Sequence, residues 1–197
     1  LQFELQPDGL DGPQILAAER ALQDMQQVLP AAWQERFDRP VRVGWSSTLP
    51  EHVHGRTRRG AITLRRDLLD DVRTGEPLPR ALQAALIHEL THVLDRAAGG
   101  GWSQTARWRD LSGWQQRPWR LGRTGNHFST RSPDAYERTS PAEFLAVNAE
   151  HFVLDPAYAC RRPAVHAWFT AQIGASGHAP DCDARLPLVQ ADDASGA

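Results

Sequence analysis

Apolar residues recur along this chain with two different periods, and these periods predict both helices and short strands. A spacing of three to four residues, which places apolar side chains on one face of a helix, runs through several long segments. Alternation of apolar and polar residues, which is typical of a half-buried strand, marks shorter ones. The predicted helices cover residues 13–29, 79–98, 140–154 and 163–173, the predicted strands cover 1–5, 41–45 and 61–64, and short helical segments are expected at 31–37 and 67–73. We therefore expect an α+β fold with a small mixed sheet and a helical C-terminal part.

The strand at residues 61–64 follows a turn at Arg58-Arg59-Gly60 and precedes the helix that starts near Pro79. An edge strand in this position would leave free backbone groups that can pair with an extended peptide. An interior strand would leave none, and the sequence does not choose between the two. The residues before the turn, through Gly55, are expected to form a loop in which His52 and His54 face solvent.

The helix at residues 79–98 carries the clearest chemical motif of the chain, His88-Glu89-Leu90-Thr91-His92. Histidines four residues apart project from the same face of a helix, one turn above the other. Two imidazoles in this arrangement can hold a zinc ion, and the glutamate beside them can act as a base on water held by the ion. Because polar residues interrupt an otherwise apolar helix face, a core helix with two merely satisfied histidines is the weaker interpretation.

A catalytic zinc site usually has three protein ligands and leaves a fourth position for water, so one ligand is missing from this motif. Asp95 lies one turn beyond His92 and is better placed to orient an imidazole than to reach the metal. Glu143 and Glu150 lie seven residues apart, on one face of the next long helix. Glu143 also completes a capping-box pattern, in which it would bond to the Ser140 amide at the start of its own helix. From the residues alone, ligand and cap are equally open roles for Glu143.

The segment Tyr136-Glu137-Arg138-Thr139-Ser140-Pro141-Ala142-Glu143-Phe144-Leu145-Ala146 resembles a segment that follows the zinc-binding helix in two groups of proteins. These groups are the catalytic domain of lethal-factor toxins and the Mlc-titration-factor zinc peptidases, which carry a tyrosine, a threonine-rich turn and a Glu-Phe-Phe-Ala run. The later run Ala149-Glu150-His151-Phe152-Val153, followed by Asp155-Pro156, is similar to the titration-factor branch. The likeness extends from residue 61 to residue 169 and leaves out the tryptophan-rich segment within that range.

This resemblance implies a gluzincin-type zinc metallopeptidase with a zincin-like fold, in which an edge strand lies beside the His-Glu-x-x-His helix. The zinc ligands that it implies are His88, His92 and Glu143. It further implies that Glu89 is the base and that the Tyr136 hydroxyl donates a hydrogen bond to the tetrahedral intermediate. Glu150 lies about 10 Å from Glu143 along the helix axis, so it would stand behind the ligands or pair with an arginine.

The composition is that of an ordinary globular domain, with 197 residues, a net charge of -2 and 41% hydrophobic residues. We expect a single domain over residues 1–188 and a polar, disordered tail over residues 189–197. The charge balance gives no electrostatic case for binding nucleic acid or an anionic membrane. No apolar run approaches the length of a membrane-spanning helix, so no integral membrane segment is expected.

The two cysteines, Cys160 and Cys182, could close a loop of about 22 residues, which would stabilise the fold by roughly 3 kcal/mol. Two unconnected buried thiols are the alternative, and the spacing matches no zinc-binding cysteine pair. A disulfide would place the protein in the bacterial periplasm or outside the cell. Because the chain begins at Leu1 rather than at a methionine, we expect that a leader has been removed, either by a cell or in cloning.

Residues 102–133 form the least regular part of the sequence and combine arginines with tryptophans. The tryptophans are Trp102, Trp108, Trp114 and Trp119. Such a segment can form a lid near an active site, stack on sugars, or pack as an extra layer over the core. We expect a flap near the active site, with plain packing over the core as the alternative.

Together these features predict a zinc metallopeptidase whose partner is a protein or peptide substrate. One alternative is an exported amidase or endopeptidase that acts on cell-wall peptides. A second is a binding module that keeps zinc only for stability, against which the intact Glu89 argues because a structural site needs no base. A third is a protease held inactive until the tryptophan-rich segment moves.

Overall fold

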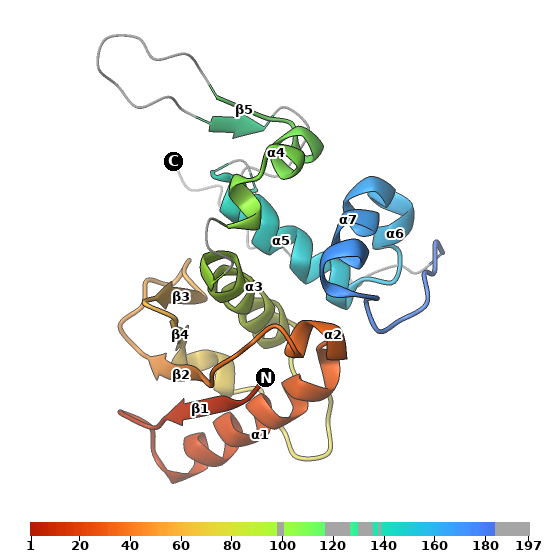
Figure 1. Ribbon diagram of the computed structural model, residues 1–197. Coiled ribbons are helices and arrows are strands. Elements are labelled where there is room, and N and C mark those ends of the chain that lie inside the picture. The colour runs from red at the N-terminus through yellow and green to blue at the C-terminus, as the bar shows by residue number, and fades with distance from the viewer. Residues whose placement is uncertain (98–100, 117–126, 130–135, 138, 184–197) are drawn as a thin grey trace, which may run out of the picture.

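The chain combines a small sheet with helices in a mixed α and β architecture (Figure 1). The computed structural model describes residues 1–97, 101–116, 127–129, 136–137 and 139–183. The strands of the main sheet are β1 (Phe3–Gln6), β2 (Val41–Ser46), β3 (Gly55–Arg58) and β4 (Ala61–Arg65). The long helices are α1 (Gly12–Val28), α3 (Arg80–Ala97), α5 (Pro141–Leu154) and α7 (Pro163–Ile173). The expected α+β class, with a small mixed sheet and a helical C-terminal part, is confirmed.

Shorter elements connect these units. They are the helices α2 (Ala31–Gln34), α4 (Ala106–Ser112) and α6 (Tyr158–Arg161), the 3-10 turns η1 (Arg66–Leu69) and η2 (Trp102–Gln104), and the ribbon of β5 (Trp114–Gln116) and β6 (His127–Ser129). The helical segment expected at 67–73 is therefore only one 3-10 turn, and the helix expected from Pro79 begins one residue later.

The main sheet has the strand order β1-β2-β4-β3. The first three of these strands run parallel, whereas β3 pairs antiparallel with β4 through a tight turn at Arg59 and Gly60. Both turn residues have positive φ angles, 52° and 76°, which suit a two-residue hairpin whose twist matches that of its strands. In the part of the chain that the structure describes, β3 is therefore an edge strand and β4 an interior one.

This topology answers the question that the sequence left open for residues 61–64, which lie in the interior. An edge strand does lie beside α3, but it is β3, part of which was expected to be loop. The reason is that β3 carries no alternation of apolar residues, since Thr57 supplies its only buried side chain. Its strand conformation depends on pairing with β4 and not on a local hydrophobic pattern.

One face of the sheet is buried and the other is open. Buried side chains alternate along β2 and β4; they belong to Val41, Val43, Trp45, Ile62 and Leu64. They join one core with residues of α1 and α3, which cover this face (Figure 1). That core continues through α5 and α7, so the β-rich and helical halves share one hydrophobic interior.

The described part of the tryptophan-rich segment contributes to this core. Trp108 on α4 is fully buried, and its ring lies 4.5 Å from the ring of Trp168 and 5.6 Å from that of Phe144. Its indole N–H donates to the Pro141 carbonyl at 3.1 Å, which holds the first turn of α5 in place. For Trp108 packing is thus the observed role, while Trp119 lies outside the described residues.

A disulfide joins Cys160 of α6 to Cys182, with their Cα atoms 5.6 Å apart. It ties the segment after α7 back to the helical half. The tail predicted at 189–197 lies outside the described residues. Within the described residues, no helix combines the length and the apolar character needed to cross a lipid bilayer.

Candidate metal centre

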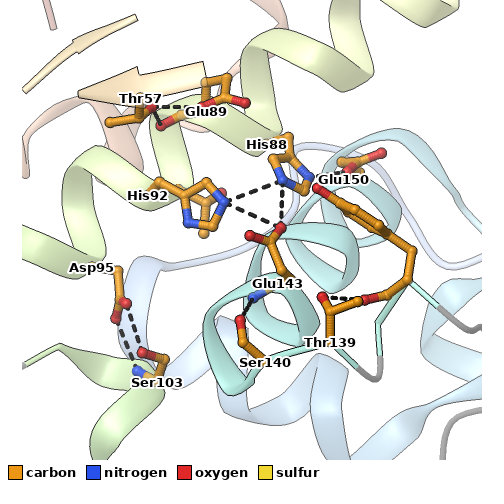
Figure 2. Close-up of polar contacts among 12 residues, drawn as sticks. Thr57, His88, Glu89, His92, Asp95, Ser103, Thr139, Ser140, Glu143 and Glu150 are labelled. Carbon is orange, nitrogen blue, oxygen red and sulfur yellow. Dashed lines mark hydrogen bonds and ion pairs between the residues drawn. The ribbon is translucent and has the colours of Figure 1, made fainter. Parts of the chain in front are cut away.

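Three donor atoms from α3 and α5 converge on one point (Figure 2). His88 Nε2 lies 3.0 Å from Glu143 Oε2 and 3.2 Å from His92 Nε2. His92 Nε2 lies 3.4 Å from the same Glu143 oxygen. In a tetrahedral zinc site with bonds of about 2.0–2.1 Å, ligand atoms lie about 3.3 Å from one another. The three atoms already have the spacing of three corners of such a site.

The two histidines reach this point because α3 is packed on both sides. His88 and His92 are each only 9% exposed, in a helix that lies between the sheet and α5. Their spacing of four residues puts both imidazoles on the side that faces α5, with ring centroids 4.8 Å apart. The helical repeat therefore places two of the three donors, and the packing of α5 brings the third.

The backbone N–H of Glu143 takes part in the helix cap, while its carboxylate faces the two histidines. Its backbone N–H donates to the Ser140 hydroxyl at 3.0 Å, which caps α5. Its carboxylate turns away from the cap and toward the histidines (Figure 2). In α1 the corresponding residue, Gln14, uses its side chain to close a full capping box with Asp11. Glu143 forgoes that bond, so its side chain is free to serve the site.

Glu150 stands behind His88. Its Oε1 lies 2.7 Å from His88 Nδ1, while Nε2 of the same ring faces Glu143. A carboxylate on one ring nitrogen fixes the tautomer of a neutral imidazole and directs the lone pair of the other nitrogen outward. Glu150 thus lies against the ring nitrogen of His88 that faces away from the three converging atoms.

The converging atoms need a cation among them. When Nδ1 of His88 carries its proton toward Glu150, Nε2 is an acceptor that faces the Glu143 carboxylate, which is also an acceptor. Burial alone would lower the pKa of His88, but the hydrogen bonds and charges of Glu143 and Glu150 outweigh burial and raise it to about 10. The same cluster lowers the pKa of Glu143: burial would raise it, and the bonds to both histidines prevail. The arrangement therefore suits a proton on His88, and the three donor atoms could instead hold a metal ion.

Glu89 lies on the sheet side of α3. Its Oε2 accepts a hydrogen bond of 2.6 Å from the Thr57 hydroxyl on β3 (Figure 2). Gly55 makes room for this arrangement, because a Cβ at that position would lie only 2.8 Å from Glu89 Cγ. The edge strand and the residue expected to be the base are therefore fitted to each other.

Tyr136 lies at the mouth of the site. Its ring centroid is 5.9 Å from that of His88, and its side chain is about half exposed. Burial and then the nearby Glu143 carboxylate raise the pKa of Tyr136, so its hydroxyl keeps the proton that a donor needs. The next residue, Glu137, anchors this segment: it is 1% exposed and accepts two hydrogen bonds of 3.1 Å from Arg162.

A cavity of about 630 Å³ opens beside these groups. Its wall includes Gly55, His88, Glu89, Tyr136 and Glu150, along with other residues of the same segments. This volume lies within the range of about 300–1,000 Å³ that is typical of ligand sites. His88, Glu89 and Tyr136 therefore line a common space, whereas His92 and Glu143 are not part of its wall.

Asp95 has a different partner from the one expected. Its two carboxylate oxygens accept hydrogen bonds from Ser103, one from the backbone N–H at 2.9 Å and one from the hydroxyl at 2.7 Å (Figure 2). Gly101 permits this approach, with φ at 75° and room for no more than a glycine beside Asp95. Asp95 thus holds the chain where it leaves α3, and in this structure it does not orient an imidazole.

Sequence reasoning missed several residues of the site. Thr57 and Gly55 lie in a strand with no hydrophobic pattern, and Glu137 is an acidic residue that only the fold shows to be buried. His52 and His54 are exposed, as expected, and they line the cavity together with His151. Only the capping pattern before Glu143 offered a local signal, and it pointed equally to another role.

A model of the family described as Domain of unknown function (DUF7844) matches residues 2–106 and 100–182. The chain belongs to this family. The two matched ranges contain every residue of the site described above. Comparison with curated proteins and with solved structures finds no match.

Proposed function

We propose that this protein is a zinc-dependent metallopeptidase of the gluzincin type. The observation that carries the proposal is the triangle of His88 Nε2, His92 Nε2 and Glu143 Oε2, with sides of 3.0, 3.2 and 3.4 Å. Two imidazole nitrogens and one carboxylate oxygen are a donor set that zinc takes in catalytic sites. The bond from Glu150 to His88 adds the outer carboxylate that zinc-bound histidines commonly have.

Bound zinc would supply Lewis-acid chemistry, since it acidifies water and polarises a carbonyl group. Glu89 is the base that takes the proton of the attacking water and then passes it to the leaving amine. Thr57 holds the carboxylate of Glu89 for this task. The Tyr136 hydroxyl donates a hydrogen bond to the oxygen that becomes negatively charged in the transition state.

The edge strand offers a place for the substrate. The Arg65 N–H donates to the His54 carbonyl at 2.8 Å, so His54 and Arg65 form a hydrogen-bonded pair. Hydrogen-bonded and non-hydrogen-bonded pairs alternate along an antiparallel ladder. Gly55 and Thr57 therefore turn their backbone groups away from β4 and toward the free edge. An extended peptide pairing with these groups would run along the cavity that Gly55 and Glu89 line. An antiparallel edge strand next to the histidine-bearing helix also supports the zincin-like fold that we propose.

The disulfide between Cys160 and Cys182 supports a proposed location in the periplasm or outside the cell. In that location the peptides of the cell wall are among the available substrates, so an amidase or endopeptidase acting on them is the second candidate. Release of soluble peptides from purified cell wall, without cleavage of denatured protein, would favour it over a general protease.

Elemental analysis together with a peptide-cleavage assay tests the proposal. The purified protein is expected to carry close to one zinc per chain and to cleave members of a mixed peptide library. Glu89→Gln should keep the metal and lose activity by several orders of magnitude, because it removes the base and spares the ligands. Glu76→Gln, a matched change at an exposed glutamate, should leave both unchanged. Full activity in Glu89→Gln, or stoichiometric zinc in both His88→Ala and His92→Ala, would contradict the mechanism.

A further inference from the structure

The edge strand β3 divides its side chains between two faces. Thr57 is buried and bonds to Glu89, and Gly55 lies against the same glutamate. Arg56 and Arg58, which alternate with them, are exposed on the opposite face of the sheet. A strand that adds to β3 would share these two faces, because paired strands keep their pleats in register.

Part of the free edge of β3 is open to such a strand. The Thr57 carbonyl points to this edge, where it accepts a hydrogen bond of 2.9 Å from Arg96 at the end of α3. The Gly55 backbone groups also point to this edge, and on this side they have no hydrogen-bond partner among the described residues. The Gly55 end of β3 therefore keeps both a backbone donor and a backbone acceptor for an incoming peptide.

The charge of Arg56 is not balanced within its row of the sheet. The row continues from Arg56 through Thr63 and Gly44 to Gln6, so it contains no carboxylate. Arg56 and Arg58 also take part in no ion pair with any residue that the structure describes. The only open position beside Arg56 in that row is the one that a peptide on the free edge would fill.

The row of Arg58, unlike that of Arg56, contains a carboxylate. It runs through Ala61 and Arg42 to Glu4, so the inner arginine has a carboxylate beside it and the outer one does not. In these two rows, the arginines of the edge strand have no carboxylate in the adjacent position, in a protein whose net charge is -2. A local pair of charges of this kind suits a few side chains of a peptide better than a long polyanion.

We infer that the peptide taken by this site carries an acidic side chain directly opposite Arg56, with a second one favoured opposite Arg58. The inference rests on the proposed function, because it assumes that a peptide pairs with β3. Residues directly opposite in paired strands have Cβ atoms about 4.5–5.5 Å apart, so opposite charges attract there and like charges repel. The site therefore prefers glutamate or aspartate at these positions and excludes lysine and arginine.

The test compares a cleaved peptide from the mixed library with versions that carry Glu, Gln or Lys at each position in turn. Glu should raise kcat/KM about three- to fivefold over Gln at one position, or at two positions separated by one residue, and Lys should lower it. Arg56→Gln should abolish this preference, and Arg56→Glu should reverse it in favour of Lys. Arg42→Gln is the matched control, since it removes the same charge from the same face two strands farther in.

Binding is measured beside cleavage, by fluorescence anisotropy of the same labelled peptides on zinc-loaded Glu89→Gln protein, alone and combined with each arginine change. Charge-dependent binding that needs Arg56, without cleavage by the unmutated protein, would support the inference and refute the peptidase function. Cleavage without a preference for Glu, or a preference that survives Arg56→Gln, would refute the inference and leave the peptidase function standing. Absence of both binding and cleavage would overturn both. Because Arg56 is exposed, unchanged thermal unfolding should accompany each substitution.

Discussion

The Thr57 hydroxyl donates a hydrogen bond of 2.6 Å to Glu89 Oε2 and lies 3.1 Å from the Glu89 carbonyl oxygen (Figure 2). The bond joins β3 to α3 across 32 residues of sequence. Both partners are buried, with Thr57 9% and Glu89 5% exposed. A buried bond of this kind holds the carboxylate in one orientation, which a base needs in order to meet its proton.

Thr57→Val should therefore lower kcat about tenfold or more, with little change in KM or zinc content, because it removes a hydrogen bond to a charged group and keeps the shape of the side chain. Thr57→Ser restores the hydroxyl and should keep most of the activity. Steady-state kinetics and elemental analysis on both variants provide the measurement. Equal losses in the two variants would mean that the strand needs threonine for packing and not for its bond to Glu89.

Gly55→Ala should reduce activity by displacing Glu89. The added Cβ would lie 2.8 Å from Glu89 Cγ and 2.9 Å from a Leu64 methyl group, so the glutamate must move. Zinc content should stay near that of the parent, because the added Cβ would meet Glu89 and Leu64 and none of the three donor residues. Gly12→Ala is the control, since a Cβ there meets nothing within 4 Å. Unchanged kcat in Gly55→Ala would show that Glu89 tolerates another position.

The two glutamates of α5 should differ in their effect on zinc affinity. Glu143→Gln removes a donor from the triangle and should weaken binding the most. Glu150→Gln keeps the triangle and loses only the charged partner of His88, a change that typically costs about 10- to 100-fold in metal affinity. Competition with a chromophoric chelator measures both. A larger loss in Glu150→Gln would exchange the roles and leave Glu143 as the helix cap.

Tyr136→Phe should lower kcat and spare KM. The hydroxyl lies next to the site and keeps its proton, so its loss should cost roughly 1.5–3 kcal/mol of transition-state stabilisation. Zinc content and thermal stability should not change, because the ring is half exposed and the phenylalanine keeps it. Unchanged kcat would assign Tyr136 to the wall of the cavity alone.

Zinc should compete with a proton on His88. The folded, metal-free protein holds this pKa at about 10, above the ordinary value of 6.5, so His88 is protonated at neutral pH. Zinc binding at pH 7.5 should then release a proton, and affinity should fall as the pH is lowered. Calorimetric titrations in two buffers of different ionisation enthalpy count the protons. His52→Ala, at an exposed histidine, should leave that count unchanged, and a count of zero in the parent would contradict the assignment.

The same shift predicts a change in the stability of the metal-free protein. A raised pKa means that the folded state binds the proton more tightly than the unfolded state does. The stabilisation is fully present below pH 6.5 and is lost as the pH rises through about 10. Thermal unfolding across that window should show the loss, and His88→Ala should remove it.

The sequence by itself determined the long helices and the first two donors. The period of apolar residues in α1, α3 and α5 is a local property, and so are the capping residues Asp11 and Ser140. The separation of four residues between His88 and His92 is enough to put both imidazoles on one side of a helix. None of these features depends on which other part of the chain packs nearby.

Only the tertiary structure decided the choice of partners. Glu143 could cap or bind, and the packing of α5 on α3 across 55 residues of sequence turned its carboxylate to the histidines. Asp95 could reach toward an imidazole, yet Ser103 returns within bonding distance and takes both of its oxygens. Strand β3 has no apolar pattern of its own and exists because β4 pairs with it. These partners are set by the free energies of contacts between segments that are distant in sequence. A buried polar group bonds to whichever partner the fold brings within reach. A local sequence pattern therefore cannot predict the partner.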